Sequence, residues 1–415
     1  MSLDSSYSVK EIREICKINA SSYSKKDNWD FFNYLDTKNI TKGEINEIKH
    51  LNPTIEKIPS RAKRKVNIDD IIISTVRPNQ EHYGIIKYET DNFLVSTGFT
   101  TLTVDKTVAI PKFIYYYITQ NHITNSLQTI AEQSTTSYPS IKPSDIGDLV
   151  INLPPIDIQK KISNILSSIE DKIEINKRIN KNLDDLCHSL FKYYFIDFIP
   201  FYDDDFIDSD IGEIPKEWSI TTVGNILDCK LGGTPSRSNE SYWGGDIAWI
   251  NSGKVNDFRI IEPSEYITEK GLKKSATKLL PAKTTVIAIT GATLGQISLL
   301  EIDSCANQSV IGIIPNINYP YEFVYPLISS ILIDLLKHQT GGAQQHINKN
   351  NVESFKIICP PAEIISEYKR IVSPIYSKIS ANCFEIEKLQ KLSDTLLPKL
   401  MSGEIDVSKI NCDLE

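Results

Sequence analysis

Polar side chains that could contact nucleic acid stand at matching places in the two halves of the chain. A glycine-led loop carries Gln344, Gln345 and His346, and glutamine can pair bidentately with adenine in the major groove of DNA. Ser137 and Tyr138 hold the corresponding place in the first half. The same side chains could instead anchor a domain through internal hydrogen bonds, and the residue types alone leave both roles open.

Basic side chains supply a second set of candidates for DNA binding. Arg237 follows a Thr-Pro-Ser sequence and suits a phosphate clamp or a guanine reader, and Lys63, Arg64 and Arg77 have a similar claim in the first half. Most contacts in protein–DNA complexes are to phosphate, so we expect these residues to serve binding more than sequence choice.

The motifs of DNA-modifying and DNA-cleaving enzymes are missing from the sequence. The Gly-Ala-Thr-Leu-Gly run at 291–295 lacks the third glycine and the lysine of phosphate-binding loops, so a tight turn is expected there, with Thr293 as a further DNA-contact candidate. There is no Asn-Pro-Pro-Tyr or Asp-Pro-Pro-Phe motif, no phosphate loop and no His-Glu-x-x-His motif. The six histidines are not clustered at metal-ligand spacing. We therefore expect no catalytic residue and no metal site.

Length and composition indicate a globular protein of several domains. The 415 residues suggest about two to four domains, and the 40% hydrophobic and 24% charged residues are typical of soluble proteins. No apolar run reaches the ~18 residues of a transmembrane helix, and no signal peptide is visible. Seven cysteines without Cys-x-x-Cys spacing argue against a disulfide framework and a zinc knuckle. A cytoplasmic protein without membrane contact is expected.

The net charge of −8 does not exclude a nucleic-acid partner, because the acidic residues are unevenly distributed. Seven acids and no base lie between Asp197 and Glu213, which leaves 45 basic against 53 − 7 = 46 acidic residues elsewhere. Binding a polyanion requires a local basic face, and residues 57–65 and 270–283 each hold five bases. Each run alone is more typical of a solvated surface, so composition leaves the partner open.

The sequence repeats itself with a period of 206 residues. From residue 151 to 190, 13 of 40 positions are identical 206 residues later, beginning with Pro-Pro at 154–155 and 360–361. Each copy continues with apolar residues in a heptad pattern, which predicts two helices of ~40 residues and ~60 Å. Asn176 and Asn382 occupy equivalent seam positions and are expected to set the register of an antiparallel pair. The alternative is two unrelated helices, each lying on its own domain.

Several motifs in the second half are found together in one protein family. They are Gly-Glu-Ile-Pro-Lys-Glu-Trp at 212–218, Gly-Gly-Thr-Pro-Ser at 232–236, Tyr-Trp-Gly-Gly-Asp-Ile at 242–247, Asn-Gln-Ser at 307–309 and Gly-Gly-Ala-Gln-Gln-His-Ile at 341–347. Together with the Pro-Pro helix starts, these motifs resemble the DNA-specificity subunit of type I restriction-modification systems. The resemblance covers essentially the whole chain and is weaker in the first half, which lacks the Gly-Gly-Thr-Pro-Ser element.

The resemblance implies an α+β fold with two mixed α/β target-recognition domains, two long antiparallel coiled-coil helices and an internal pseudo-two-fold repeat. The expected segments are a first recognition domain (1–152), a first spacer helix (153–198), an acidic linker (199–214), a second recognition domain (215–358), a second spacer helix (359–401) and a C-terminal tail (402–415).

The function that the resemblance implies is sequence-specific binding of a bipartite double-stranded DNA target, with one half-site for each domain. The chain is then a non-catalytic subunit that docks two methyltransferase subunits and restriction/translocase subunits. It is expected to bind no cofactor itself, with S-adenosylmethionine, ATP and magnesium on the partner subunits. A self-contained DNA enzyme and a protein-binding scaffold remain as alternatives, and the target sequence cannot be read from the chain.

Overall fold

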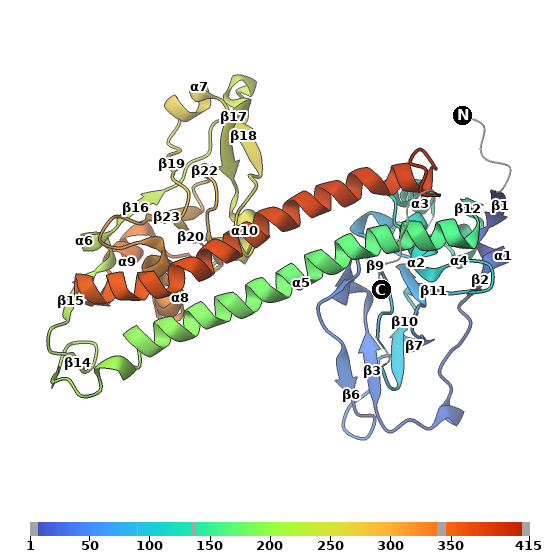
Figure 1. Cartoon of the computed structure of the whole chain (residues 1–415), viewed down its shortest axis with the longest axis horizontal. Coiled ribbons are helices and arrows are strands. Elements are labelled where there is room, and N and C mark those ends of the chain that lie inside the picture. The colour runs from blue at the N-terminus through green and yellow to red at the C-terminus, as the bar shows by residue number, and fades with distance from the viewer. Residues whose placement is uncertain (1–6, 89, 135–137, 338–345, 409–415) are drawn as a thin grey trace. The chain divides into compact units, whose positions relative to one another are not determined.

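The computed structural model describes residues 7–88, 90–134, 138–337 and 346–408 (Figure 1). The chain divides into two compact units, one made of Met1–Asp171 and Leu389–Glu415, the other of Lys172–Lys388. Each unit holds one mixed α/β domain and a part of both long helices, α5 (Ile156–Phe195) and α10 (Ala362–Met401).

The first domain is built on two four-stranded sheets, ordered β6-β3-β10-β7 and β2-β11-β8-β9. The pair β1 and β12 joins the beginning of the domain to its end. The strands are β1 (Ser8–Glu11), β2 (Cys16–Ile18), β3 (Phe32–Leu35), β4 (Ile40–Thr41), β5 (Glu44–Ile45), β6 (Lys49–Leu51), β7 (Ala62–Lys65), β8 (Ile71–Ser74), β9 (Tyr83–Ile85), β10 (Phe93–Ser96), β11 (Phe99–Val104) and β12 (Val150–Leu153). The helices are α1 (Ile12–Ile15), α2 (Pro111–Ile118), α3 (Asn121–Glu132) and α4 (Pro143–Gly147).

The second domain has the same arrangement, with sheets ordered β18-β17-β22-β19 and β16-β23-β20-β21. Its strands are β15 (Ser219–Thr222), β16 (Asp228–Leu231), β17 (Trp243–Ile250), β18 (Glu265–Ile267), β19 (Leu279–Leu280), β20 (Thr285–Ala288), β21 (Ile297–Leu299), β22 (Ser304–Ala306), β23 (Val310–Ile314) and β24 (Lys356–Cys359). Its helices are α6 (Val223–Ile226), α7 (Glu269–Lys273), α8 (Tyr321–Leu336) and α9 (Lys349–Glu353).

The strand directions repeat as closely as the strand order. β10 pairs parallel with β3, and β22 pairs parallel with β17, while the other pairings in these four-stranded sheets are antiparallel in both domains. β15 pairs with β24 as β1 pairs with β12. The repeat seen in the sequence of the helices therefore extends through both domains, and the expected fold class is confirmed.

Apolar, β-branched runs form the centre of each domain. The sequence runs 71–76, 284–289 and 310–313 predict buried strands, and the structure forms β8, β20 and β23 there. All residues of these three strands are buried except Ile314 at the end of β23. Side chains of this kind fit a pleated surface that is covered on both faces. The cores also take in the helices, since Ile162, Leu166 and Leu400 pack in the first core and Cys187 and Tyr368 in the second.

The long helices run antiparallel to each other within the second unit. Asn176 of α5 donates a hydrogen bond to Glu385 of α10 at 2.9 Å. One turn further along α5, Asn180 accepts a hydrogen bond from Asn382 at 2.8 Å. Because the partner number falls as the α5 number rises, the two chain directions are opposite.

The seam between the helices differs from the heptad pattern in one of its two rows. The heptad pattern predicts one row through Ile162, Ile169, Asn176, Leu183 and Leu190 and a second row through Ile165, Lys172, Ile179 and Leu186. In the first row Ile162 and Asn176 are buried and the other three residues are half-buried, whereas Leu186 of the second row is 45% exposed. Asn180 and Cys187, one position later, are 2% and 0% exposed in its place. The apolar pattern predicted the wrong row, because the apolar residues Ile179 and Leu186 face solvent whereas Asn180 and Cys187 are buried.

The two asparagines that were expected to set the register are both buried, Asn176 at 1% and Asn382 at 0% exposed. They do not pair with each other, since each has a different partner across the seam. In an antiparallel pair, residues at equivalent places of the repeat lie at different heights, so equivalence in sequence does not give contact.

Proline and glycine set the ends of the long helices. The spacer helices, expected at 153–198 and 359–401, begin later, because Leu153 and Cys359 end β12 and β24 and the Pro-Pro pairs intervene. The sequence also predicts a kink at Pro374, because an internal proline removes a helix hydrogen bond, and the structure places this residue inside the continuous helical segment α10. Beyond α10, Gly403 adopts a left-handed conformation with φ of 73°.

The segments after the two helices also carry structure. The acidic linker is mostly exposed, as expected, but it contains the pair β13 (Phe206–Ile207) and β14 (Ile214–Pro215). Residues 402–408 of the expected C-terminal tail pack within the first unit, where Val407 is 2% exposed and Lys161 of α5 donates to the carbonyl of Ser408 at 2.6 Å.

We predict that the buried Asn180–Asn382 pair is costly to break on one side only. Asn382→Leu leaves the side-chain oxygen of Asn180 without its donor and should lower the free energy of unfolding by about 1–3 kcal/mol. Replacing both residues by leucine removes both polar groups and should restore or raise stability. Urea denaturation of the two variants and the parent measures this, and a double variant weaker than the single one would contradict it.

A buried carboxyl group on α5 should give a pH-dependent contribution to stability. Tyr116 of α2 donates a hydrogen bond to Glu170 at 2.9 Å, and burial raises the pKa of Glu170 above its usual value of 4.5. The folded protein therefore holds this proton more tightly than the unfolded chain, and the stability from it is lost as the pH rises through the raised pKa. Glu170→Gln should unfold at higher urea than the parent at pH 8 and at nearly the same urea at pH 4. An equal difference at both pH values would contradict the prediction.

Candidate nucleic-acid interface

Four chain segments meet at one edge of the β16-β23-β20-β21 sheet. The end of β16 reaches the start of β23, where the amide of Gly232 donates to the carbonyl of Val310 at 3.0 Å. The end of β20 joins them, since the amide of Ile289 donates to the carbonyl of Ser309 at 2.9 Å. The amide of Ile347 in turn donates to the carbonyl of Ile289 at 3.2 Å. We call these segments, residues 232–238, 289–295, 307–309 and 346–347, the reading edge of the second domain.

The Gly-Gly-Thr-Pro-Ser motif belongs to this edge because its glycines permit close backbone contact. A Cβ atom on Gly232 would lie 2.1 Å from the carbonyl oxygen of Asn307, and one on Gly233 would lie 2.5 Å from the amide of Thr277. Thr234 then donates to the side chain of Gln308 at 2.5 Å. Motifs far apart in sequence thus build one loop cluster.

Arg237 is exposed at this edge, but its charge is already matched. Two guanidinium nitrogens donate to Glu265 at 2.6 and 2.7 Å, and the guanidinium stacks 3.7 Å from the ring centre of Trp243. The bond to Glu265 raises the pKa of Arg237 and lowers that of Glu265. A phosphate would have to compete with this carboxylate, and nothing in the arginine's own sequence motif pointed to a partner 28 residues away.

Thr293 and His346 come together at the reading edge. Thr293 lies in the 3₁₀ turn η7 (Gly291–Thr293), which follows β20 as the expected tight turn, and Gly291 has a φ of 66°. His346 is exposed, and its backbone bridges that of Thr290 directly before this turn. Gln344 and Gln345, the other candidates in this loop, lie outside the described residues.

The first domain has the same edge, built by the ends of β2 and β8 and the start of β11. The amide of Asn19 donates to the carbonyl of Thr101 at 2.8 Å, and that of Thr75 donates to Gly98 at 2.8 Å. The amide of Ile141 donates to Thr75 at 2.9 Å, as Ile347 does to Ile289 in the second domain. This reading edge of the first domain comprises residues 19–22, 75–80, 96–98 and 138–141.

Arg77 stands at this edge in the position that Gly291 holds in the second domain. The bridge between Val76 and Ser140 precedes it, as the bridge between Thr290 and His346 precedes Gly291. Arg77 has a φ of 48°, a left-handed conformation that is unusual for residues other than glycine and that concentrates at functional sites.

The Arg77 side chain is exposed and lies over the ring of Tyr138 at 5.1 Å. Tyr138 is itself 60% exposed. Among the described residues, no carboxylate lies within ion-pair distance of Arg77, which leaves its charge available to an anion. Ser137, the neighbouring candidate, lies outside the described residues.

Lys63 and Arg64 lie on β7, which pairs with β10 directly before the loop 96–98. The Lys63 side chain is exposed. Arg64 is half-buried, its Nε atom is buried without a hydrogen-bond partner in the described part of the chain, and burial lowers its pKa. Arg61 at the start of this strand accepts a backbone hydrogen bond from Thr97 at 2.8 Å, which links the basic strand to the reading edge.

Within the described ranges, no cluster of three or more His, Cys, Asp or Glu residues could hold a metal ion. Over the same residues, each helix is too short or too polar to cross a membrane.

Comparison with known proteins agrees with this geometry. The family model described as the type I restriction modification DNA specificity domain matches residues 5–185 and 215–394. The chain belongs to this family. Both matched segments contain one of the two domains and most of the long helix that follows it.

Relatives along the full length carry the same description. The chain is 26% identical to the type I restriction enzyme HindI specificity subunit of Haemophilus influenzae, over 91% of this chain and 96% of that one. It is also 26% identical to the MjaIX specificity subunit of Methanocaldococcus jannaschii, over 97% and 93%. The S subunit structure from M. genitalium matches the fold with a TM-score of 0.58 and 16% identity, over 96% of this chain and 98% of that one.

The expectation of a specificity subunit, the non-catalytic component of a type I system, is confirmed by these matches. In the second domain the family motifs build the reading edge through the contacts of Gly232, Gly233, Thr234 and Gln308. Sequence reasoning missed Glu265, which belongs to none of the motifs and pairs with Arg237. Gln308 is part of the Asn-Gln-Ser motif, but only the structure shows that Thr234 donates to it.

Proposed function

We propose that this specificity subunit reads a bipartite double-stranded DNA target, with one half-site for each domain. It docks two methyltransferase subunits and joins restriction/translocase subunits in the cytoplasm. The chain itself binds no cofactor, and S-adenosylmethionine, ATP and magnesium belong to the partner subunits.

One observation carries this proposal, namely that both domains present the same loop edge with side chains suited to DNA. In the first domain the edge offers exposed Tyr138 and, beside it, Arg77, which forms no ion pair with a carboxylate in the described part of the chain. In the second it offers Arg237, Thr293 and His346. Equivalent edges with different side chains are what two half-sites of different sequence require, because base readout depends on individual side chains.

An exposed apolar stripe on α5 supports docking of partner subunits. Ile175, Ile179, Leu186 and Tyr193 are 50, 36, 45 and 44% exposed, and their spacing of four and seven residues places them on one face. Leu392 of α10, the repeat equivalent of Leu186, is 46% exposed. The other three stripe positions correspond to Ala381, Glu385 and Lys399, so the stripe is a feature of α5. An exposed apolar stripe of this kind is typical of a protein-interaction surface.

The decisive experiment is to sequence the methylated bases of a host that expresses this subunit with its methyltransferase and of the same host without the subunit. We expect one bipartite motif with an unspecified spacer, present only when the subunit is present. Methylation of a continuous motif, or of the same motif without the subunit, would contradict the proposal. An unchanged methylome would favour a protein-binding scaffold.

We predict that Arg77 contributes to binding of this motif through phosphate or base contact. Arg77→Ala should weaken binding of the subunit–methyltransferase complex to a duplex with the motif by about tenfold, and should reduce the salt slope of log K by about one. Arg13→Ala is the matched control, because Arg13 is equally a surface arginine but is paired with Glu11 and Asp148 at 2.6 and 2.7 Å. Equal losses in the two variants would show that Arg77 has no special role.

A further inference from the structure

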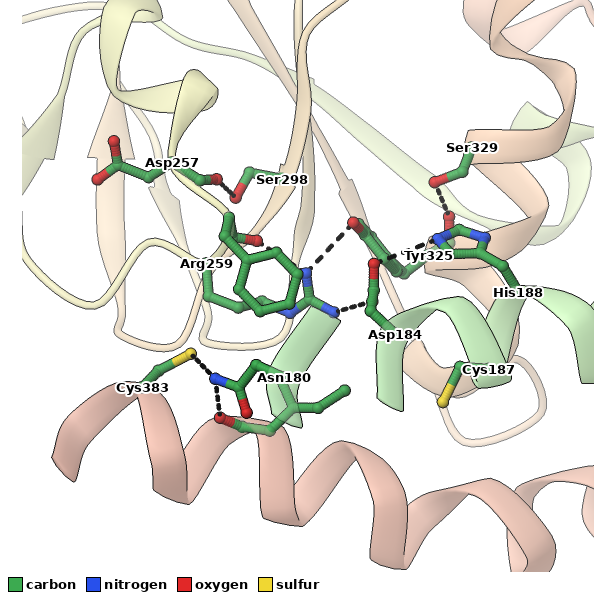
Figure 2. Close-up of polar contacts among 12 residues, drawn as sticks. Asn180, Asp184, Cys187, His188, Asp257, Arg259, Ser298, Tyr325, Ser329 and Cys383 are labelled. Atoms are coloured by element: carbon green, nitrogen blue, oxygen red, sulfur yellow. Dashed lines mark hydrogen bonds and ion pairs between the residues drawn. The ribbon is translucent and has the colours of Figure 1, made fainter. Parts of the chain in front are cut away.

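A buried ion pair joins the second domain to helix α5 (Figure 2). Nη2 of Arg259 lies 2.7 Å from Oδ1 of Asp184, which is on α5. The arginine side chain is 0% exposed and the aspartate side chain 16%. Arg259 comes from the segment that follows the 3₁₀ turn η6 (Ser252–Asn256), so the contact links a loop of the domain to the helix.

Hydrogen bonds from Nη1 and Nη2 and two aromatic rings orient the guanidinium group of Arg259, while its buried Nε atom has no hydrogen-bond partner among the described residues. Nη1 donates to the carbonyl of Phe258 at 2.7 Å and to the hydroxyl of Tyr325 at 3.3 Å, as Figure 2 shows. The rings of these two residues lie 4.3 and 4.6 Å from the guanidinium carbon. On the other side, Asp184 has His188 at 3.7 Å as a further neighbour. A planar group held by three acceptors and two rings is a directional contact.

The backbone around Arg259 is bound to the edge strand β21. The hydroxyl of Ser298 donates to the carbonyl of Asp257 at 2.7 Å. On the other side, the amide of Ile260 donates to Leu299 at 3.0 Å, and the amide of Glu301 donates to Ile260 at 2.9 Å. A movement of the sheet must therefore carry Arg259 with it.

The same end of β21 also contacts α10. Ser380 of α10 donates to the buried carboxylate of Glu301 at 2.6 Å, and Lys283 forms an ion pair with this carboxylate. The sheet is thus attached to α5 through Arg259 and to α10 through Glu301. Two attachment points on two helices prevent the sheet from rotating about either one.

This attachment lies close to the reading edge of the second domain. The turn η6, which ends three residues before Arg259, contacts both β20 and the turn η7 that carries Thr293. A change in the position of Arg259 is therefore passed on to the loops that face DNA in the proposed function.

Stability alone does not account for a charged pair at this place. Buried ion pairs are often no more stabilising than apolar residues of similar volume, because removing both charges from water costs about as much as their attraction returns. Apolar contacts, however, are non-directional and permit sliding. A hydrogen-bonded charged pair has a preferred geometry and can therefore fix the orientation of the domain on the helix, which apolar packing alone does not.

We propose that Arg259 and Asp184 are positioning residues that set the angle of the second recognition domain on the helix pair, and thereby the spacer length that the subunit accepts. The proposal rests on the proposed reading of a bipartite target. Neither residue touches DNA in this account. Their replacement should change the tolerated distance between half-sites, and not the half-site sequences.

The test uses the subunit with its methyltransferase in cells and compares three forms. Asp184→Ala leaves the buried guanidinium of Arg259 without its carboxylate partner and should lower the folding equilibrium constant about 100-fold or more. The double variant R259M/D184L removes both charges and should keep the urea midpoint of the parent. In the methylome it should modify the parent half-sites at neighbouring spacer lengths, with discrimination between spacers reduced about tenfold, which corresponds to about 1.4 kcal/mol.

The control is the double variant K273M/E269L, which removes a pair at 2.8 Å within α7 of the second domain, away from η6, β21 and the long helices. It should retain one spacer length. Unchanged spacer discrimination in R259M/D184L, a changed half-site sequence, or loss of its cooperative unfolding would each overturn the proposal. An Asp184→Ala variant as stable as the parent would also overturn the proposal, and urea denaturation measures this without DNA. If the parent itself modifies no bipartite motif, the proposed function fails instead.

Discussion

Adding one turn to both long helices should lengthen the unspecified spacer of the target by one or two base pairs. Duplicating residues 176–179 in α5 and 382–385 in α10 adds four residues, or ~6 Å, to each helix. These segments face each other through the hydrogen bond from Asn176 to Glu385, so the paired insertion preserves the register. At ~3.4 Å per base pair, the added length corresponds to one or two base pairs. The readout is the methylated motif in cells that carry the insertion.

The half-sites themselves should be unchanged in this variant, because no residue of either reading edge is altered. An insertion in α5 alone serves as the control, since it moves Asn180 away from Asn382 and should lower stability. A fully active paired insertion with the parent spacer would show that the helices do not measure the distance between half-sites.

Exchanging the first recognition domain should replace one half of the target and leave the other half intact. The variant carries residues 1–152 of a relative with a different target, joined at the Pro-Pro pair before α5. We expect complete loss of the parent motif and the appearance of a hybrid motif, because the Arg77 edge is built only from residues of the exchanged segment.

The complementary exchange, of residues 215–358, should replace the other half-site. Methylome sequencing of both chimeras checks the prediction. A chimera in which both half-sites change would mean that the two domains do not read DNA independently. Loss of all methylation in one chimera has to be separated from unfolding, which urea denaturation of the purified chain does.

Local signals in the sequence were strong enough to predict most elements of this fold. The β-branched runs became β8, β20 and β23, and the glycines of 291–295 became a turn with φ of 66° and 84° at its ends. The proline pairs and heptads predicted both long helices to within a few residues. These signals are local because they depend on backbone preferences and on the period of the apolar residues.

Which face of a helix is buried was decided by its partners. Leu186 is exposed and Cys187 is buried, although the apolar pattern favours the reverse. The reason is that Tyr368 donates to the carbonyl of Cys187 at 3.4 Å and the second domain packs on the same side of α5. An apolar residue of a helix can lie in the core or on an exposed surface that could bind another protein. The sequence of one chain does not distinguish these two positions.

The sequence by itself determined the duplication, the family and the positions of the long helices, because sequence identity, motifs and apolar periodicity depend only on the order of residues along the chain. The tertiary structure alone decided that Arg237 is paired with Glu265, that Arg77 occupies the place of a glycine, and that Arg259 reaches Asp184. Glu265 is 28 residues from Arg237, and Asp184 is 75 residues from Arg259. Gly291, the equivalent of Arg77 in the second domain, is 214 residues away. Contacts at such separations arise from the packing of sheets and helices, where burial and charge pairing are settled by distance in space and leave no periodic trace along the chain.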